Sequence, residues 1–153
     1  MALRNVVLMG NEILRKKCKI VEKFDDNLSE LLDDMYETMV KNGGVGIAGP
    51  QVGILKRIFV IEIDGLKMEF VNPTIIKQSG SIVAQEGCLS VKNKNGYVDR
   101  PETITVKAYN RNGVEFELTI SQWPARVICH EYDHLDGVLF VDKIIEDYKP
   151  KKR

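Results

Sequence analysis

The strongest constraint in this sequence is the spacing of its two histidines. His130 and His134 stand four residues apart, and Glu131 directly follows the first. In a helix this spacing places both imidazoles on one face, one turn apart, where they can bind the same metal ion. Glu131 would then lie beside the metal and could transfer protons. We therefore expect a helical metal site here, rather than two incidental histidines that cap or hydrogen-bond nearby carbonyls.

Length and charge favour a single domain that meets a small substrate in a pocket. The chain has 153 residues, enough to bury its own core, and its 22 basic residues balance 22 acidic ones. No net field therefore attracts DNA or a membrane surface. We see no secretion signal, no membrane-spanning stretch and no disulfide pattern among the three cysteines. We expect a cytoplasmic protein with one catalytic domain at 1–148 and a short basic tail at 149–153.

The first part of the chain predicts an amphipathic helix followed by strands. Apolar residues follow helical spacing from Leu28 to Val40, after candidate caps at 25–27 and before Asn42 and two glycines. Runs of β-branched and aromatic residues predict strands at 57–63, 68–73 and 81–84. A hairpin is predicted from strands at 103–109 and 114–120 around a turn at 110–113.

The histidines are predicted to lie on a largely buried helix. Ser121 is a candidate cap, Pro124 falls in the first turn, and Gly137 is placed to end the helix. The apolar positions that should bury it are Trp123, Val127, Ile128 and Leu135. A short strand is expected at 138–141. The fold class is thus α+β, with antiparallel β-sheets packed around the buried helix carrying the HEYDH motif and an N-terminal amphipathic helix.

A catalytic metal site needs a third protein ligand. A histidine six residues beyond the second is excluded because Phe140 occupies that place. Glu146 is the only glutamate after the motif, but it lies twelve residues on, beyond a predicted strand. Cys88 is the better candidate, because neighbouring glycine lets the backbone approach a metal and a thiol there can ionise. We interpret Cys18 and Cys129 as structural.

Three short motifs occur in order along the chain: GVGIAGPQ at 44–51, EGCLS at 86–90 and HEYDHLDG at 130–137. Together they span most of the sequence, and the chain resembles the peptide deformylase family. The resemblance implies that the metal ligands are Cys88, His130 and His134. It also implies that Glu131 is the acid/base, and that Gln51 and the backbone amide of Leu89 stabilise the oxyanion.

The chain departs from the family pattern at three positions. Gly49 stands where alanine is usual, Cys129 where glutamine precedes the first histidine, and Lys92 where proline commonly follows the second motif. None of these changes removes a catalytic group. They bear on local packing and substrate preference rather than on the reaction.

The resemblance implies removal of the N-formyl group from the formylmethionine of newly synthesised polypeptides, with release of formate. A metal held by one thiolate and two imidazoles leaves a position for water and lowers its pKa, so that hydroxide can attack. Glu131 would take the water proton as general base and return it to the departing amine as general acid. The family implies Fe²⁺, with Zn²⁺, Ni²⁺ or Co²⁺ as replacements, and the ligand set alone does not decide between them.

The expected substrate pocket is less sharply defined. Val45, Leu89 and Val127 are candidates to line it, Gly46 would present backbone to the peptide, and Arg126 would reach its edge. Each of these is equally compatible with an ordinary core or surface position. Asp133 and Arg100 are expected to form an ion pair that steadies the helix.

Two other functions and one further partner stay open at this point. A metal could merely hold the helix to the sheet, although a closed structural site needs four ligands and only three good ones are evident. A small peptidase could use the same water activation. The basic tail suggests weak contact with ribosomal RNA, although lysine-rich ends are usually only solvated.

Overall fold

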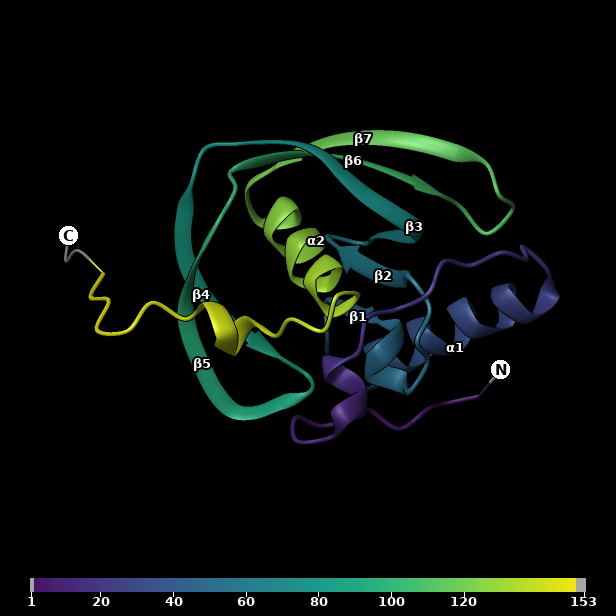
Figure 1. Cartoon of the computed structure of the whole chain (residues 1–153), viewed down its shortest axis with the longest axis horizontal. Coiled ribbons are helices and arrows are strands. Elements are labelled where there is room, and N and C mark those ends of the chain that lie inside the picture. Colours follow the sequence, from purple (N-terminus) through teal and green to yellow (C-terminus); the bar gives the residue numbers. More distant parts are fainter. Residues whose placement is uncertain (1, 151–153) are drawn as a thin grey trace.

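The computed structural model describes residues 2–150, so positions 151–153 of the expected basic tail lie outside the described residues. The described chain is mixed α and β (Figure 1). Its elements are η1 (Glu12–Arg15), α1 (Asp26–Lys41), β1 (Gly46–Ala48), η2 (Gly49–Val52), β2 (Ile58–Ile63), β3 (Leu66–Ser79), β4 (Ile82–Cys88), β5 (Val91–Arg100), β6 (Thr103–Tyr109), β7 (Glu115–Ser121), α2 (Gln122–His134) and η3 (Phe140–Lys143).

The strands form two antiparallel sheets with α2 between them. One sheet has the order β1-β2-β3-β6-β7, and the other pairs β4 with β5. In Figure 1 the five-stranded sheet curves over one side of α2 while the β4–β5 pair closes the other side, and α1 lies beyond β1 and β2. This arrangement confirms the expected α+β class.

Helix α1 forms where the sequence pattern predicts it. The side chain of Asp25 accepts a hydrogen bond from the amide of Leu28 and so caps the first turn. Apolar residues at helical spacing are buried on one face, among them Leu28, Leu32, Met35 and Met39. The expected role of this face as core is confirmed.

The first four residues of strand β2, Ile58–Ile61, are apolar because both faces of the strand are covered there. Phe59 and Ile61 pack in the cluster around α2, whereas Ile58 and Val60 pack in the cluster around α1. The ring of Phe59 stacks on that of Phe70 in β3, with centroids 4.7 Å apart. Alternate residues of one strand therefore join the two helices to the same sheet.

The two ends of α2 differ in how well they are capped. Ser121 occupies the N-cap position, but its side chain makes no capping hydrogen bond, and Gln122 has a positive φ of 64°. At the other end Gly137 has a φ of 75°, with the Gly137 amide bonded to the carbonyl of His134 and the Val138 amide to that of Asp133. These two bonds are the Schellman arrangement, so the expected glycine stop is confirmed.

Four expectations about the fold are wrong. Residues 91–100 form β5 although no strand was expected there, and β3 continues past Pro73 to Ser79. The apolar run at 138–141 is not a strand, because the chain turns into η3 at Phe140. Trp123 is 48% exposed rather than buried, since it lies at the first turn of α2 where the helix emerges at the cavity mouth.

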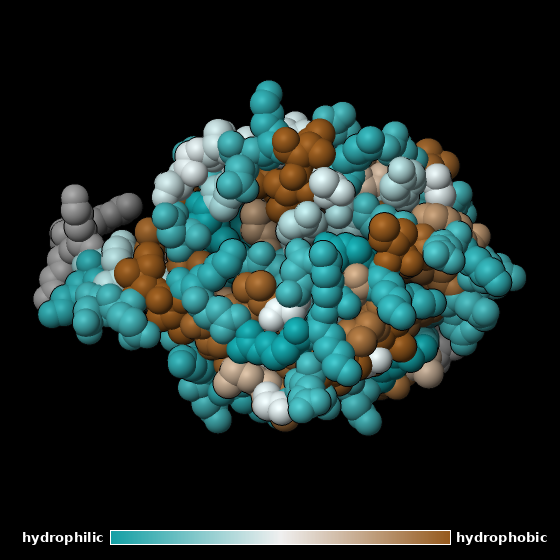
Figure 2. All heavy atoms as spheres, viewed as in Figure 1, coloured by the Kyte–Doolittle hydropathy of each residue, from teal (hydrophilic) through white to brown (hydrophobic). Residues whose placement is uncertain are grey.

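The surface is mixed in polarity. In Figure 2 the apolar residues on the face shown lie in small patches separated by hydrophilic ones. Within residues 2–150, neither helix has the length and apolar character needed to cross a bilayer.

Candidate metal centre and active site

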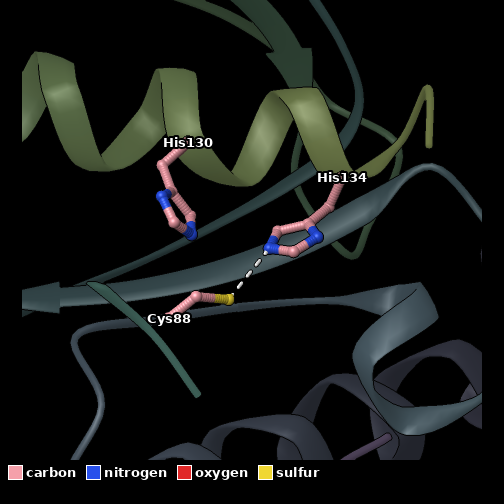
Figure 3. Close-up of side chains that lie close together, drawn as sticks. All are labelled: Cys88, His130 and His134. Carbon is pink, nitrogen blue, oxygen red and sulfur yellow. Dashed lines mark hydrogen bonds between the residues drawn. The ribbon is translucent and has the colours of Figure 1, made fainter. Parts of the chain in front are cut away.

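Helix α2 brings the two histidines together and strand β4 brings Cys88 to them. Figure 3 shows both imidazoles pointing from α2 toward the thiol. The Sγ atom of Cys88 lies 3.5 Å from Nε2 of His134, and the donor atoms of Cys88, His130 and His134 all lie within 4.8 Å of one another. Bonds of about 2.0–2.3 Å to a tetrahedral metal require similar separations between ligands. The three side chains therefore fit one metal ion.

The alternative third ligand, Glu146, does not share this site. It is exposed, and the metal-ligand group found among residues 2–150 contains Cys88 instead. Cys18 and Cys129 are buried away from it, and burial raises the pKa of each thiol to about 11. Neither thiol is ready to ionise near neutral pH.

Glu86 fixes the orientation of His130, a role that sequence reasoning missed. Its buried carboxylate lies 3.0 Å from Nδ1 of His130 and accepts from Arg100 at 2.9 Å and from Arg126 at 2.5 Å. Burial opposes its charge, but the hydrogen bonds from His130 and Arg100 hold the pKa of Glu86 well below its usual range. Since the carboxylate keeps a proton on Nδ1, Nε2 is the nitrogen that can bind a metal.

The ion pairs extend from Glu86 to the end of the helix. Arg100 also donates to Asp133 at 2.5 Å, which confirms the expected pair. Arg126 lines the cavity as a wall residue, but its guanidinium donates to Glu86 and to the carbonyls of Val98 and Ile82. The structure thus gives Arg126 a part in holding Glu86, beyond the edge position that the sequence suggested.

The two histidines differ in charge in the absence of a metal. Burial opposes protonation of His130, but contacts with Cys88 and Glu86 raise its pKa to about 10. Burial and the neighbouring His130 charge lower the pKa of His134 well below its ordinary value. Since a metal binds the neutral imidazole, metal binding and protonation of His130 compete.

Glu131 lines the same cavity, and its carboxyl group is poorly supplied with hydrogen-bond partners among residues 2–150. Its carboxyl group is buried, and its Oε1 atom has no hydrogen-bond partner among the residues that the structure describes. Burial raises the pKa of Glu131 to about 7. A buried carboxyl oxygen without a partner is costly, and such groups concentrate at functional sites. Glu131 is therefore placed to exchange protons with a molecule that enters the cavity.

Gln51 lies beside the thiol and its amide is held on three sides. Its Oε1 accepts from the amide of Ala48 at 2.9 Å, and its Nε2 donates to Oγ of Ser90 at 3.1 Å and to Sγ of Cys88 at 3.5 Å. Leu89 follows Cys88 at the β4–β5 turn and lines the same cavity. Both residues that the sequence proposed for the oxyanion thus border the metal ligands.

Close packing around residue 49 explains why glycine replaces the usual alanine of the family there. A Cβ atom at this position would lie 2.7 Å from the carbonyl oxygens of both Ile54 and Lys56. An alanine would therefore force the loop after η2 outward. The glycine lets the carbonyls of Ile54 and Lys56 pack closely against the start of η2.

The cavity itself has a volume of about 220 Å³. Its wall includes the candidate pocket residues Val45, Gly46 and Val127, and Trp123 stands at the half-exposed first turn of α2. The polar side chains that line it are Gln51, Glu86, Cys88, Arg126, His130 and Glu131. The cavity thus brings an apolar wall against the metal-ligand group.

A thiol and two imidazoles arranged around one metal position, beside a buried carboxyl whose Oε1 has no partner among residues 2–150, are the features of a metal-dependent hydrolase site. The comparisons then give the family: residues 3–150 match the polypeptide deformylase family model, and the chain belongs to this family. Its members remove N-formyl groups from nascent polypeptides. The chain is 55% identical over 145 residues to peptide deformylase from Caldicellulosiruptor bescii, covering 95% of this chain and 87% of the relative.

Solved structures agree. A crystal structure of peptide deformylase from Thermotoga maritima has a TM-score of 0.93 and 39% identity, covering 95% of this chain and 99% of that one. A Met-Ala-Ser-bound class I type b peptide deformylase from Acinetobacter baumannii has a TM-score of 0.89 and 34% identity, covering 94% and 99%.

Proposed function

We propose that this chain deformylates N-formylmethionyl peptides with Glu131 as general base and then general acid, beside a metal held by Cys88, His130 and His134. The observation that carries this proposal is the carboxyl group of Glu131, which is buried in the cavity and whose Oε1 has no partner among residues 2–150. A purely structural metal site would leave this costly feature without a purpose.

A divalent metal ion, when bound, would polarise the formyl oxygen and lower the pKa of a water molecule. The chain supplies the proton transfers. In the metal-free protein burial raises the pKa of Glu131 to about 7, toward the range in which a carboxyl group both accepts and donates a proton. Glu131 therefore takes a proton from the attacking water and gives it to the departing amine.

Gln51 and the backbone amide of Leu89 are proposed to stabilise the charge that develops on the formyl oxygen. The Oε1 and one N–H of Gln51 are fixed by Ala48 and Ser90, so the orientation of the amide is set. With the amide plane fixed in this way, its other N–H is directed at the metal-ligand group, where it donates to Sγ of Cys88 at 3.5 Å. A donor held beside the place where the formyl oxygen would lie contributes about 10²–10³ in rate.

The substrate class is proposed from the cavity. A volume of about 220 Å³ is below the size of most ligand sites, about 300–1,000 Å³, and suits one side chain and a small acyl group. Val45, Leu89 and Val127 offer apolar surface for methionine, and Gly46 leaves its backbone open to the peptide. The Met-Ala-Ser peptide bound to the A. baumannii protein supports a substrate whose first residue is methionine.

Three finer assignments complete the proposal. We infer Fe²⁺ as the metal, with Zn²⁺, Ni²⁺ or Co²⁺ able to replace it. We infer a cytoplasmic location, because formylated chains are made there.

We also propose that the tail at 149–153 contacts ribosomal RNA weakly. Unchanged co-sedimentation with ribosomes after deletion of residues 149–153 would contradict the last point.

The test distinguishes three outcomes for a blocked tripeptide: release of the formyl group, cleavage of a peptide bond, or no reaction. Ferrous-loaded protein, handled without oxygen, is given formyl-Met-Ala-Ser and acetyl-Met-Ala-Ser. Release of formate without release of acetate supports the proposal. Cleavage of the Met-Ala bond would favour a peptidase, and no turnover by protein with one metal ion bound would favour a structural site.

A further inference from the structure

Two backbone hydrogen bonds connect the N-terminal residues to the candidate active site. We name residues 2–9 the N-terminal strap. The amide of Val7 donates to the carbonyl of Gln51 at 2.7 Å, and the amide of Met9 donates to the carbonyl of Ser90 at 2.7 Å. The side chains of these same two acceptors are bonded to each other, Nε2 of Gln51 donating to Oγ of Ser90. The strap thus crosses the junction at which Gln51 meets the β4–β5 turn.

This junction lacks the support of strand pairing. Gln51 lies in η2, a single short turn next to the five-stranded sheet, whereas Ser90 follows the thiol in the separate two-stranded sheet. Strand pairing does not join the sheets within residues 2–150. The two strap bonds therefore add a backbone connection between the segment that carries the amide and the segment that carries the thiol.

The other end of the strap is fastened to α1. The buried carboxylate of Asp34 accepts from the amide of Ala2 at 2.8 Å and from the guanidinium of Arg4 at 3.1 Å. The amide of Arg4 also donates to Oγ1 of Thr38 at 2.9 Å. The strap is therefore held along its length rather than only at the site.

Apolar packing alone does not explain why the strap follows this path. Leu3 and Leu8 are largely exposed. Val6 packs in the cluster around α1, whereas Val7 packs in the cluster formed with η1, β5 and η3. The strap therefore lies across two parts of the core, where its amides fix the spacing between them.

We propose that the N-terminal strap is a positioning element that holds the amide of Gln51 at its working distance from Cys88, acting through the amides of Val7 and Met9. This inference rests on the oxyanion role proposed for Gln51. A misplacement of about 1 Å in a catalytic group can cost about a hundredfold in rate. Loss of one strap bond is expected to lower kcat by roughly tenfold, with KM within about twofold of its original value.

Alternate residues of the strap offer matched variants. Val7→Pro and Met9→Pro each delete an amide hydrogen that is bonded to the site. Leu8→Pro is the control, because the backbone bond in which Leu8 takes part uses its carbonyl, which accepts from Asn11 and is kept in proline.

A second variant replaces the backbone N–H of residue 7 by an ester oxygen and keeps the valine side chain. Cys18 allows a synthetic segment of residues 1–17, with an ester in place of the amide at residue 7, to be ligated to residues 18–153. This protein separates loss of the hydrogen bond from any effect of proline on folding.

The decisive measurement combines each strap variant with Gln51→Ala, using formate release from formyl-Met-Ala-Ser by metal-loaded protein. If the strap acts through Gln51, it lowers kcat in the original background and has no further effect in the Gln51→Ala background. Equal losses in both backgrounds, or unchanged kcat in strap variants while Gln51→Ala is slow, would overturn the inference. Unchanged kcat in Gln51→Ala itself would instead overturn the role of Gln51, and the inference with it.

Discussion

A Cβ atom at Gly46 would lie 2.6 Å from Oε2 of Glu131. The carboxyl group of Glu131 can occupy this part of the cavity because Gly46 in β1 has no side chain. Glu131 is also the residue whose other oxygen has no partner among residues 2–150. The glycine of the first motif and the glutamate of the third thus form one structural unit, although 85 residues separate them.

Gly46→Ala is expected to displace Glu131 without removing a metal ligand. Since misplacing a catalytic group costs up to about 10² in rate, kcat should fall by about one to two orders of magnitude. Metal content should stay at the original level, measured by elemental analysis beside formate release. The control is Gly65→Ala in the β2–β3 turn, outside the cavity, where a Cβ would meet nothing within 4 Å and the positive φ strains only that turn. Full activity in Gly46→Ala would show that the contact has no functional importance.

Glu86→Gln should weaken metal binding and destabilise the fold together. The amide cannot accept from Arg100, Arg126 and His130 as the carboxylate does, and it leaves two buried guanidinium groups short of a counter-charge. Loss of one partner of a buried ion pair costs about 3–5 kcal/mol, and loss of the group behind a metal-ligating histidine costs about 10–100-fold in affinity. Chemical denaturation and competition with a chelator measure the two effects. A normal metal affinity in the folded variant would contradict the role assigned to Glu86.

The metal-free protein should lose stability through Glu131 as the pH rises from about 4.5 to 7. Burial raises the folded-state pKa to about 7 from an ordinary value of 4.5, so the folded state binds the proton more tightly than the unfolded state. Glu131→Gln should therefore be more stable than the original protein at pH 8, by up to about 3 kcal/mol, and this gain should shrink toward pH 5. Thermal unfolding of both proteins across this range measures the difference. A gain that grows as the pH falls would show the opposite pKa shift.

The three thiols should differ sharply toward an alkylating reagent. Burial raises the pKa of Cys18 and Cys129 to about 11, so at pH 8 almost none of either thiol is ionised. Iodoacetamide should therefore modify folded, metal-free protein at Cys88 alone, and metal loading should protect that residue. Peptide mass mapping locates the modification. Labelling of Cys129 at the same rate would contradict the burial that the structure gives it.

Local patterns predicted the elements whose partners are close in sequence. Helix α1 needed only its cap and its apolar spacing, and the β6–β7 hairpin needed only its turn, with Val106 paired to Leu118 as alternation requires. The three metal-ligand candidates could also be predicted from the sequence, because the residue types and their spacing strongly restrict which chemistry is possible.

The errors arose where distant residues decide the outcome. Strand β5 contains the polar run Lys92–Asn95, and the strand forms because β4 pairs with Val91 on one side of that run and with Gly96–Arg100 on the other. At 138–141 an apolar run is buried by packing of Leu139 and Phe140 against η1 and β5 rather than by strand pairing. Glu86 was overlooked because its partners lie 14, 40 and 44 residues away.

The most direct test of the central claim compares Glu131→Gln with Glu146→Gln. Both change a glutamate to its amide, but Glu146 is exposed and outside the cavity. Formate release from formyl-Met-Ala-Ser is measured for both, beside metal content. We expect Glu131→Gln to bind one metal ion and lose at least about 10² in kcat, as removal of a general base does, while Glu146→Gln keeps its activity. Undiminished deformylation by metal-loaded Glu131→Gln would contradict the proposed mechanism.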